Sequence, residues 1–215
     1  MRESGIYQMY LKNLLDRLLA LVGTAALSWL LILLGIAIHL DSPGPIFFRQ
    51  KRAGKNGTYF YIYKFRTMRI DTPHDMLTHM LNNPDLFITR VGRFLRKTSL
   101  DELPQLFNIL KGDMAFVGPR PERPEIAELY KKSIPEFDFR LKMKAGLTGY
   151  AQVFGKYSTT PYDKLKLDLT YIENYTFALD LMIIIQTVKI LFQKENSEGL
   201  DTGQKTALRT EDKKN

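Results

Sequence analysis

The longest hydrophobic stretch of the chain lies near its start. Residues 18–38 form a run of 21 positions without a charged side chain. A helix of that length can cross a bilayer core of roughly 30 Å. A secretory signal peptide would have a shorter apolar run and then a small-residue cleavage site, whereas DSPGP follows here at 41–45. We therefore predict a permanent membrane anchor over residues 1–40, with a fully buried helix of a soluble protein as the alternative.

The charges that flank this run leave its orientation open. Basic residues lie before it, at Lys12 and Arg17, and after it, between positions 49 and 55, so the positive-inside rule selects neither orientation. If the rest of the chain acts on cytosolic substrates, both flanks lie on the cytoplasmic face, and the helix must bend and return as a re-entrant hairpin. The weak points for such a bend are Gly23, Thr24 and Ser28. No proline in the run forces it.

Strand patterns follow the anchor. Residues 46–52 and 58–68 are rich in aromatic and β-branched side chains and flank the turn sequence AGKNG at 53–57, which predicts a β-hairpin. Alternation along the second strand puts Lys64 and Arg66 on one face. Solvated charges on an edge strand are the simpler explanation of this pair.

Helical patterns dominate the remainder. Residues 91–110 are periodic but are interrupted at 99–104 by a capping signature followed by proline, so one helix ends there and another begins. Further helices are predicted over 122–142, 162–175 and 178–193, with a loop and short helix at 69–90, a rigid turn at 117–121 and a loop at 146–149. The helix over 178–193 is apolar on most of its surface but carries Asp180, Gln186 and Lys189. It fits an interfacial helix and an ordinary core helix equally well.

These elements predict a helix-rich α+β fold. A membrane-embedded, re-entrant N-terminal helix, a β-hairpin and amphipathic interfacial helices would surround a small catalytic domain over residues 41–193. Residues 194–215 are polar and without periodicity, which predicts a disordered tail.

Composition narrows the chemistry. The net charge of +8 implies an anionic partner, which could be nucleic acid, an anionic membrane surface or a phosphorylated substrate. The chain has no cysteine, so thiolate metal sites and disulfides are excluded. It lacks the GxxxxGK[ST], GxGxxG and GxSxG motifs of P-loop, Rossmann and hydrolase sites. His74 and His79 are five positions apart, which is not the spacing of a helical metal pair, so a surface loop explains them better.

The main candidate for chemistry is the adjacent carboxylate pair Asp101 and Glu102. In isolation the pair is better explained as a capping box in which Ser99 caps a helix and Glu102 reaches back. However, a helix start and the preceding basic residues Arg96 and Lys97 would also keep both acids ionised. That state is needed for a carboxylate nucleophile or a magnesium ligand. Neighbouring helical positions diverge by about 100°, so the two acids would have different roles.

A second candidate is Arg120, which stands between Pro119 and Pro121. Two prolines restrict the backbone on each side, so the guanidinium could bind phosphate bidentately at little entropic cost. A structural turn with a solvated arginine is the alternative, and the tetrapeptide alone would favour it.

Taken in order, five segments resemble the bacterial sugar transferase family, the monotopic phosphoglycosyl transferases. The resemblance covers roughly residues 9–193. Its most specific part is SLDELPQLFNILKGDMAFVGPRP at 99–121. The supporting segments are DSPGPIFFRQKRAGKNG (41–57), YKFRTM (63–68), GLTGYAQVFG (146–155) and DLTYIENYTFALDL (168–181). Agreement across all five by chance is not credible.

The resemblance implies a reaction and a set of site residues. Asp101 would attack the β-phosphate of a UDP-sugar, release UMP and form a covalent phosphosugar-aspartate, which polyprenol phosphate would resolve. Mg²⁺ would be held by Asp101 and Glu102. Phosphate oxygens would be held by Lys64, Arg66, Arg96 and Arg120. Further candidate substrate contacts are Pro119, Pro121, Gln152, Lys156, Asp168 and Tyr171.

The family also implies a location and leaves some features open. The catalytic domain would lie on the cytoplasmic face of the bacterial inner membrane, at the first membrane step of glycan assembly. Trp29 stands where the family usually has proline after a serine, which keeps a spanning helix as the alternative to the re-entrant bend. Lys156 replaces a frequent arginine and lacks its bidentate fork, so we rank it below Arg120. The sugar and the oligomeric state are not predicted.

Two other functions remain as alternatives. A catalytically silent, basic, membrane-anchored adaptor would need only the anchor and the positive charge, and would tolerate replacement of Asp101 and Glu102. Nucleic-acid binding is suggested by charge alone, and no known nucleic-acid motif accompanies it. We therefore expect no nucleic-acid partner.

Overall fold

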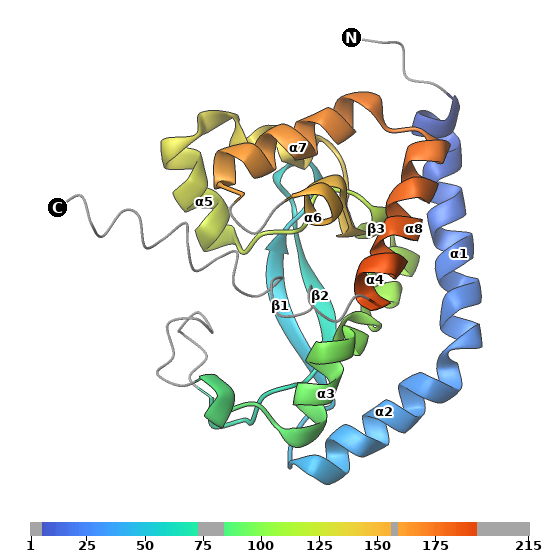
Figure 1. Cartoon of the computed structure of the whole chain (residues 1–215), viewed down its shortest axis with the longest axis vertical. Helices are drawn as coiled ribbons and strands as arrows, with labels where there is room; N and C mark the ends of the chain where they lie inside the picture. The colour runs from blue at the N-terminus through green and yellow to red at the C-terminus, as the bar shows by residue number, and fades with distance from the viewer. Residues whose placement is uncertain (1–5, 73–83, 156–158, 193–215) are drawn as a thin grey trace, which may run out of the picture.

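The computed structural model describes residues 6–72, 84–155 and 159–192. Figure 1 shows the hairpin of β1 and β2 in the centre, with the bent helix pair α1 and α2 along one side and α8 beside α1. The predicted tail, the histidines at 74 and 79, and Lys156 lie outside the described residues.

The N-terminal hydrophobic run forms two helices. After a short π-helical turn, Tyr7–Leu11, come α1 (Lys12–Ala26) and α2 (Ser28–Asp41), which are bent by 62° at Leu27. In the described part of the chain no single helix is long and apolar enough to cross a bilayer, but this bent pair passes that test together. The bend lies in the region that the weak points predicted.

Side-chain hydroxyls accompany the bend. Thr24 donates to the carbonyl of Ala20 at 2.7 Å, and Ser28 donates to that of Ala25 at 2.8 Å. Such bonds compete with the helical ladder and favour bending. Trp29 is 65% exposed. A bend is therefore formed without a proline at position 29.

The predicted hairpin is confirmed. Strands β1 (Phe47–Ala53) and β2 (Tyr59–Phe65) pair antiparallel, with Phe47 opposite Phe65. A 3₁₀ turn, Lys55–Gly57, connects them. Ile62 and Phe65 of β2 are both buried, on opposite faces of the strand and in two different core clusters.

The predicted interruption of the helix at 99–104 is also confirmed. Helix α3 (Arg90–Thr98) is followed by the 3₁₀ turn η5 (Leu100–Glu102) and then α4 (Gln105–Lys111). A short 3₁₀ turn, Pro84–Leu86, precedes them. The capping box is wrong, however, because Ser99 adopts the left-handed conformation with φ of 56° and its side chain makes no capping hydrogen bond.

A second sheet was not predicted. Strands β3 (Met114–Val117) and β4 (Ala145–Thr148) pair in parallel, where a loop was expected at 146–149. The approach is close enough that a Cβ atom on Gly146 would lie 2.2 Å from the amide nitrogen of Gly118. Each strand has only four residues and its partner is distant in sequence, so no local pattern indicated the pairing.

The single helix expected over 122–142 is wrong. It is divided into α5 (Pro124–Ser133) and the 3₁₀ segment η6 (Pro135–Lys142). Proline removes an amide donor and disfavours the helical conformation of the residue before it, so α5 ends before Pro135. The short α6 (Tyr150–Phe154) follows β4.

The last two predicted helices are confirmed as α7 (Pro161–Asn174) and α8 (Phe177–Phe192). In α8, Ile183 is fully buried while Leu181 and Ile185 are exposed. The helix therefore has one core face and one exposed apolar face. Asp180 accepts hydrogen bonds from Tyr7 and Lys12, which ties α8 to the N-terminal segment.

The N-terminal helix shares a core with the rest of the chain. Ala20 of α1 is fully buried in a cluster with Ile62 of β2 and Leu106 and Ile109 of α4. In a second cluster, Leu34 and Ile38 of α2 pack with Leu100 and Leu103, so the helix pair also lies behind the turn that carries the two carboxylates.

Candidate functional site

The carboxylate pair lies where three segments meet. Asp101 and Glu102 occupy the turn η5 between α3 and α4, and Lys64 reaches them from the end of β2. Its Nζ lies 2.6 Å from Oε1 of Glu102 and 3.9 Å from Oδ2 of Asp101. The Asp101 side chain is 14% exposed and that of Glu102 is 20% exposed. Both acids therefore lie in a partly shielded site that is open to solvent.

Arg120 completes this site from the loop after β3. Its Nη2 donates to Oε1 of Glu102 at 3.2 Å, the same oxygen that accepts from Lys64. The Arg120 side chain is 42% exposed. The structure thus brings together four of the predicted residues, Asp101, Glu102, Lys64 and Arg120.

The two acids differ in electrostatic environment. Burial raises the pKa of Glu102, but the charges of Arg120 and Lys64 outweigh it and lower the pKa to about 2. Burial also raises the pKa of Asp101, and the neighbouring charge of Glu102 raises it further. The charge of Lys64 lowers this pKa, but the net shift is upward. Glu102 is therefore the firmly ionised member of the pair, and Asp101 is the carboxylate whose negative charge is less stabilised.

Arg96 lies at the edge of the site. Its Nε donates to Oγ1 of Thr67 at 2.9 Å. Its positive charge lowers the pKa of Asp101, although by less than Lys64 does and not enough to offset burial. Arg96 thus contributes positive potential at Asp101 while it is hydrogen-bonded to Thr67.

Arg66 does not join the pair. Its side chain is buried and its Nη1 donates to the carbonyl of Pro43 at 2.7 Å, while Nη2 donates to that of Ser42 at 2.6 Å. Arg66 thus holds the chain that leaves α2, and it makes no ion pair with Asp101 or Glu102 in the described residues. The alternation that placed Lys64 and Arg66 on one face does not apply, because β2 ends at Phe65.

Asp168 and Tyr171 are enclosed within the fold rather than presented to a ligand. Each is 1% exposed. Asp168 accepts from Nε of Arg140 at 2.7 Å, and Tyr171 donates to Oδ1 of Asp180 at 2.5 Å. The structure therefore gives these two predicted substrate contacts structural partners.

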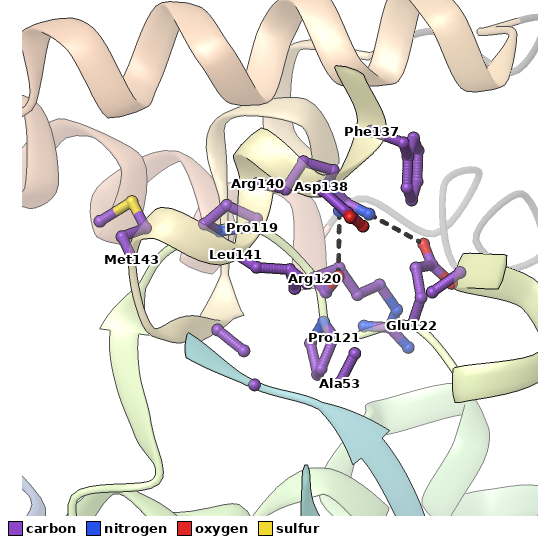
Figure 2. Close-up of a pocket in the computed structure, with 13 residues that line it drawn as sticks. Ala53, Pro119, Arg120, Pro121, Glu122, Phe137, Asp138, Arg140, Leu141 and Met143 are labelled. Carbon is purple, nitrogen blue, oxygen red and sulfur yellow. Dashed lines mark hydrogen bonds and ion pairs between the residues drawn. The ribbon is translucent and has the colours of Figure 1, made fainter. Parts of the chain in front are cut away.

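The remaining predicted contacts, Pro119, Pro121 and Gln152, lie on the loop after β3 and on α6. Pro119 and Pro121 line a small cavity with Phe137 and Arg140, adjacent to Arg120 (Figure 2). Gln152 lies on α6, and its buried Oε1 has no hydrogen-bond partner within the described chain. No interaction joins Gln152 to the carboxylate pair among the described residues.

Sequence reasoning missed one buried residue that positions the site. Asn108 of α4 is fully buried, accepts from the amide of Tyr63 at 3.0 Å and donates to the carbonyl of Tyr61 at 2.8 Å. It therefore fixes α4 against β2, the strand that carries Lys64. The sequence did contain a signal for this role, because Asn108 is a polar residue among the apolar residues of α4.

Sequence reasoning also missed a buried ionic cluster behind Arg120. It consists of Arg52, Glu122, Arg140, Asp168 and Lys164. In the sequence Arg140 fell within a predicted charged helix, where a solvated side chain was the natural expectation.

The carboxylate pair has the donor atoms that a Mg²⁺ site requires. No group of three or more acidic or histidine side chains that could hold a metal ion occurs among the described residues. Mg²⁺ usually takes one or two carboxylates and completes its shell with water and substrate phosphate. Adjacent, partly exposed Asp101 and Glu102 provide that donor set, so the residues present fit the ion.

Comparison with known proteins defines the class. Residues 7–194 match the model of the bacterial sugar transferase family. The match covers most of the chain, so this protein belongs to that family.

Individual relatives have related names. The chain is 42% identical to a UDP-glucose:undecaprenyl-phosphate glucose-1-phosphate transferase of Caulobacter vibrioides, over 86% of the chain and 71% of the relative. It is 40% identical to a protein of the same name from Xanthomonas campestris pv. campestris, over 90% of the chain. It is 37% identical to a UDP-N-acetylgalactosamine-undecaprenyl-phosphate N-acetylgalactosaminephosphotransferase of Aeromonas hydrophila, over 87% of the chain. The chain spans only 42% and 45% of the lengths of the latter two.

Proposed function

We propose that this protein transfers a sugar-1-phosphate from a UDP-sugar to polyprenol phosphate, such as undecaprenyl phosphate, and releases UMP. Family membership supports the reaction class, and the names of the relatives support these substrates. The observation that carries the proposal is the clamp of Lys64 and Arg120 on Glu102, directly beside Asp101. This arrangement combines a carboxylate nucleophile with cations suited to phosphate oxygens.

In the first half of the proposed reaction, a carboxylate oxygen of Asp101 attacks the β-phosphorus of the UDP-sugar. The bond from that phosphorus to the oxygen bridging the two phosphates breaks, and UMP leaves with the bonding electron pair. The product is a phosphosugar joined to Asp101 as an acyl phosphate. The upward shift in the pKa of Asp101, caused first by burial, favours this role because a less stabilised carboxylate is a better nucleophile.

In the second half, a terminal oxygen of polyprenol phosphate attacks the same phosphorus. The bond to Asp101 breaks, the carboxylate is restored, and the sugar leaves on a polyprenol diphosphate. No oxidant, reductant or net proton transfer is needed at the aspartate. Phosphoryl transfer places its charge on phosphate oxygens, so the main tasks of the protein are positioning and electrostatic stabilisation.

The other residues serve those two tasks. Lys64 and Arg120 lie on the Glu102 side of the pair and supply positive charge where the diphosphate would bind. Arg96 adds positive potential at Asp101. Asp101 and Glu102 would hold Mg²⁺, which supplies charge neutralisation for the diphosphate when bound.

We also propose a location for this chemistry. The bent helix pair α1 and α2 would enter and leave the cytoplasmic leaflet of a bacterial inner membrane, so that the catalytic domain lies on the cytoplasmic face. The bend of 62° and the charge on both flanks support this topology. The reaction would be the first membrane step of glycan assembly, of capsule, exopolysaccharide or glycoprotein.

The test is UMP release from a panel of UDP-sugars with purified protein, polyprenol phosphate and Mg²⁺. We expect Mg²⁺-dependent release with at least one sugar, and a loss of about 10³-fold or more in Asp101→Asn. Asp71→Asn is the matched control, because Asp71 pairs with Arg69 on an exposed segment. Full activity in Asp101→Asn would reject the mechanism, and no UMP release with any sugar would favour a catalytically silent adaptor.

A further inference from the structure

Four consecutive backbone carbonyls around Arg120 each accept a hydrogen bond from another part of the fold, at 3.0 Å in every case. The acceptor and donor pairs are Pro119 with the amide of Gly146, Arg120 with Nη2 of Arg140, Pro121 with Nη1 of Arg52, and Glu122 with the amide of Ala53. Pro119 and Pro121 have restricted φ angles as well. The backbone that carries Arg120 is therefore held at every position from 119 to 122.

Arg140 is the more enclosed of the two arginine side chains that donate to this loop. It is 4% exposed and lies on η6, between the loop and α7. Its Nε donates to Oδ2 of Asp168 at 2.7 Å, its Nη1 lies 3.6 Å from Oε1 of Glu122, and its Nη2 donates to the Arg120 carbonyl. Figure 2 shows dashed lines from the Arg140 guanidinium to Arg120 and to Glu122.

The guanidinium geometry explains why arginine occupies this position. Its planar fork presents donors in fixed directions, so a carboxylate that binds Nε also sets the direction of Nη2. Asp168 is itself buried on α7. Glu122 is held additionally by an ion pair with Lys164, so the arginine charge is balanced without contact with the solvent.

We propose that Arg140, oriented by Asp168, is a positioning residue that sets the Arg120 side chain relative to Glu102. The proposal rests on the proposed function, in which Arg120 supplies charge at the diphosphate. Arg140 does not touch the reacting groups; it acts through the backbone of Arg120. Small displacements of such a group are costly, because a misplacement of about 1 Å can lower a rate roughly 100-fold.

The test is a double-mutant cycle with Arg140→Lys and Arg120→Ala, measured as kcat/KM for UMP release. Lysine keeps the charge but has no fork, so it cannot bind Asp168 and the Arg120 carbonyl in the same geometry. We expect Arg140→Lys alone to lower kcat/KM roughly 10- to 100-fold. In the Arg120→Ala background we expect a change of less than about 2-fold, because the two substitutions then remove the same interaction. Equal losses in both backgrounds would overturn the proposal.

The separate values of kcat and KM give a second readout. A purely structural defect lowers the amount of folded enzyme, so it lowers the apparent kcat and leaves KM for the UDP-sugar unchanged. Displacement of Arg120 instead weakens its interaction with the diphosphate, so we expect KM for the UDP-sugar to rise in both Arg140→Lys and Arg120→Ala. A lower kcat with an unchanged KM in Arg140→Lys would also overturn the proposal.

Two further variants keep the test decisive if Arg140→Lys does not fold. Asp168→Asn preserves the volume and leaves an acceptor for Arg140, and we expect a smaller loss that again disappears in the Arg120→Ala background. Lys131→Ala is the matched control, since Lys131 pairs with Asp138 on the surface of the same α5–η6 region. UMP release by the unaltered protein tests the proposed function. The positioning role is tested separately, by whether the effect of the Arg140 substitution disappears when Arg120 is replaced by Ala.

Discussion

Lys64 Nζ lies 2.6 Å from Oε1 of Glu102, although the two residues are 38 positions apart in the sequence. The contact ties the end of the central hairpin to the turn that carries both acids. Asn108 fixes the adjacent helix α4 to the same strand. The charge at the carboxylate pair is therefore set by tertiary packing, not by the local sequence around it.

Replacing Lys64 by Gln should change both the rate and the pH dependence. The pKa of Glu102 and that of Asp101 should both rise, because Lys64 lowers each against the effect of burial. We expect a fall of roughly 10- to 1000-fold in kcat/KM for UMP release, with the acid limb displaced to higher pH. Lys111→Gln is the control, since Lys111 carries the same charge nearby but pairs with Asp113. An unchanged acid limb in Lys64→Gln would contradict this account.

Arg66→Gln should affect stability instead of substrate binding. The buried guanidinium satisfies the carbonyls of Ser42 and Pro43, and leaving such groups unpaired costs about 1–3 kcal/mol for each. We expect a fall in unfolding free energy of roughly 2–4 kcal/mol, with KM for the UDP-sugar unchanged in the folded protein. Arg69→Gln, at an exposed ion pair, is the control. A large rise in KM without a loss of stability would restore Arg66 as a phosphate ligand.

The two acids should have opposite effects on stability. The folded pKa of Glu102 is about 2, against an ordinary value of 4.5, because Arg120 and Lys64 outweigh burial. Ionised Glu102 therefore contributes about 3 kcal/mol to the free energy of unfolding. This contribution is fully present above about pH 4.5 and is lost as the pH falls through about 2. Glu102→Gln should therefore lower Tm at pH 7.

The ionised side chain of Asp101 has the opposite effect and lowers the free energy of unfolding. Burial raises its folded pKa above the ordinary value of 3.8, so its contribution is present at low pH and is lost as the pH rises through the folded pKa. Asp101→Asn should therefore have an unchanged or higher Tm at pH 7, although we expect it to lose activity. Thermal unfolding of both variants in the same detergent checks the pair, and a marked loss of stability in Asp101→Asn would contradict the sign.

The membrane topology can be tested by labelling single cysteines, since the chain has none of its own. Ser4→Cys lies before the bent helix pair and Lys55→Cys lies in the hairpin turn after it. We expect both to react with a membrane-impermeant maleimide only when the cytoplasmic face is accessible. Labelling of the two positions from opposite faces would mean that α1 and α2 span the bilayer.

Local signals in the sequence were enough for several elements. The AGKNG turn between two aromatic segments predicted the hairpin, and SLDELP predicted the break between α3 and α4. The bend at Leu27 lies among the small and hydroxyl-bearing residues that were identified as weak points. Asp101 and Glu102 were candidate acids from the residues alone, but in isolation a capping box was the better explanation, and the resemblance reversed that preference.

Features that depend on distant contacts could not be predicted in this way. The pairing of β3 with β4 joins Met114 to Ala145, and neither four-residue segment is periodic enough to identify a strand. Arg66 and Arg140 are charged residues in apparently exposed segments, and only the fold shows that both side chains are buried. The end of α5 is different, because Pro135 was a visible local signal that the prediction of one continuous helix overlooked.

In the proposed mechanism, Asp101 carries the phosphosugar between two half-reactions. The most direct measurement is to mix the purified protein with a reactive UDP-sugar and Mg²⁺ in the absence of polyprenol phosphate, quench, and determine UMP and intact mass. We predict UMP release up to about one equivalent of enzyme and a mass increase of one sugar-phosphate, located on Asp101. UMP released only after polyprenol phosphate is added, with no adduct on the protein, would contradict the claim.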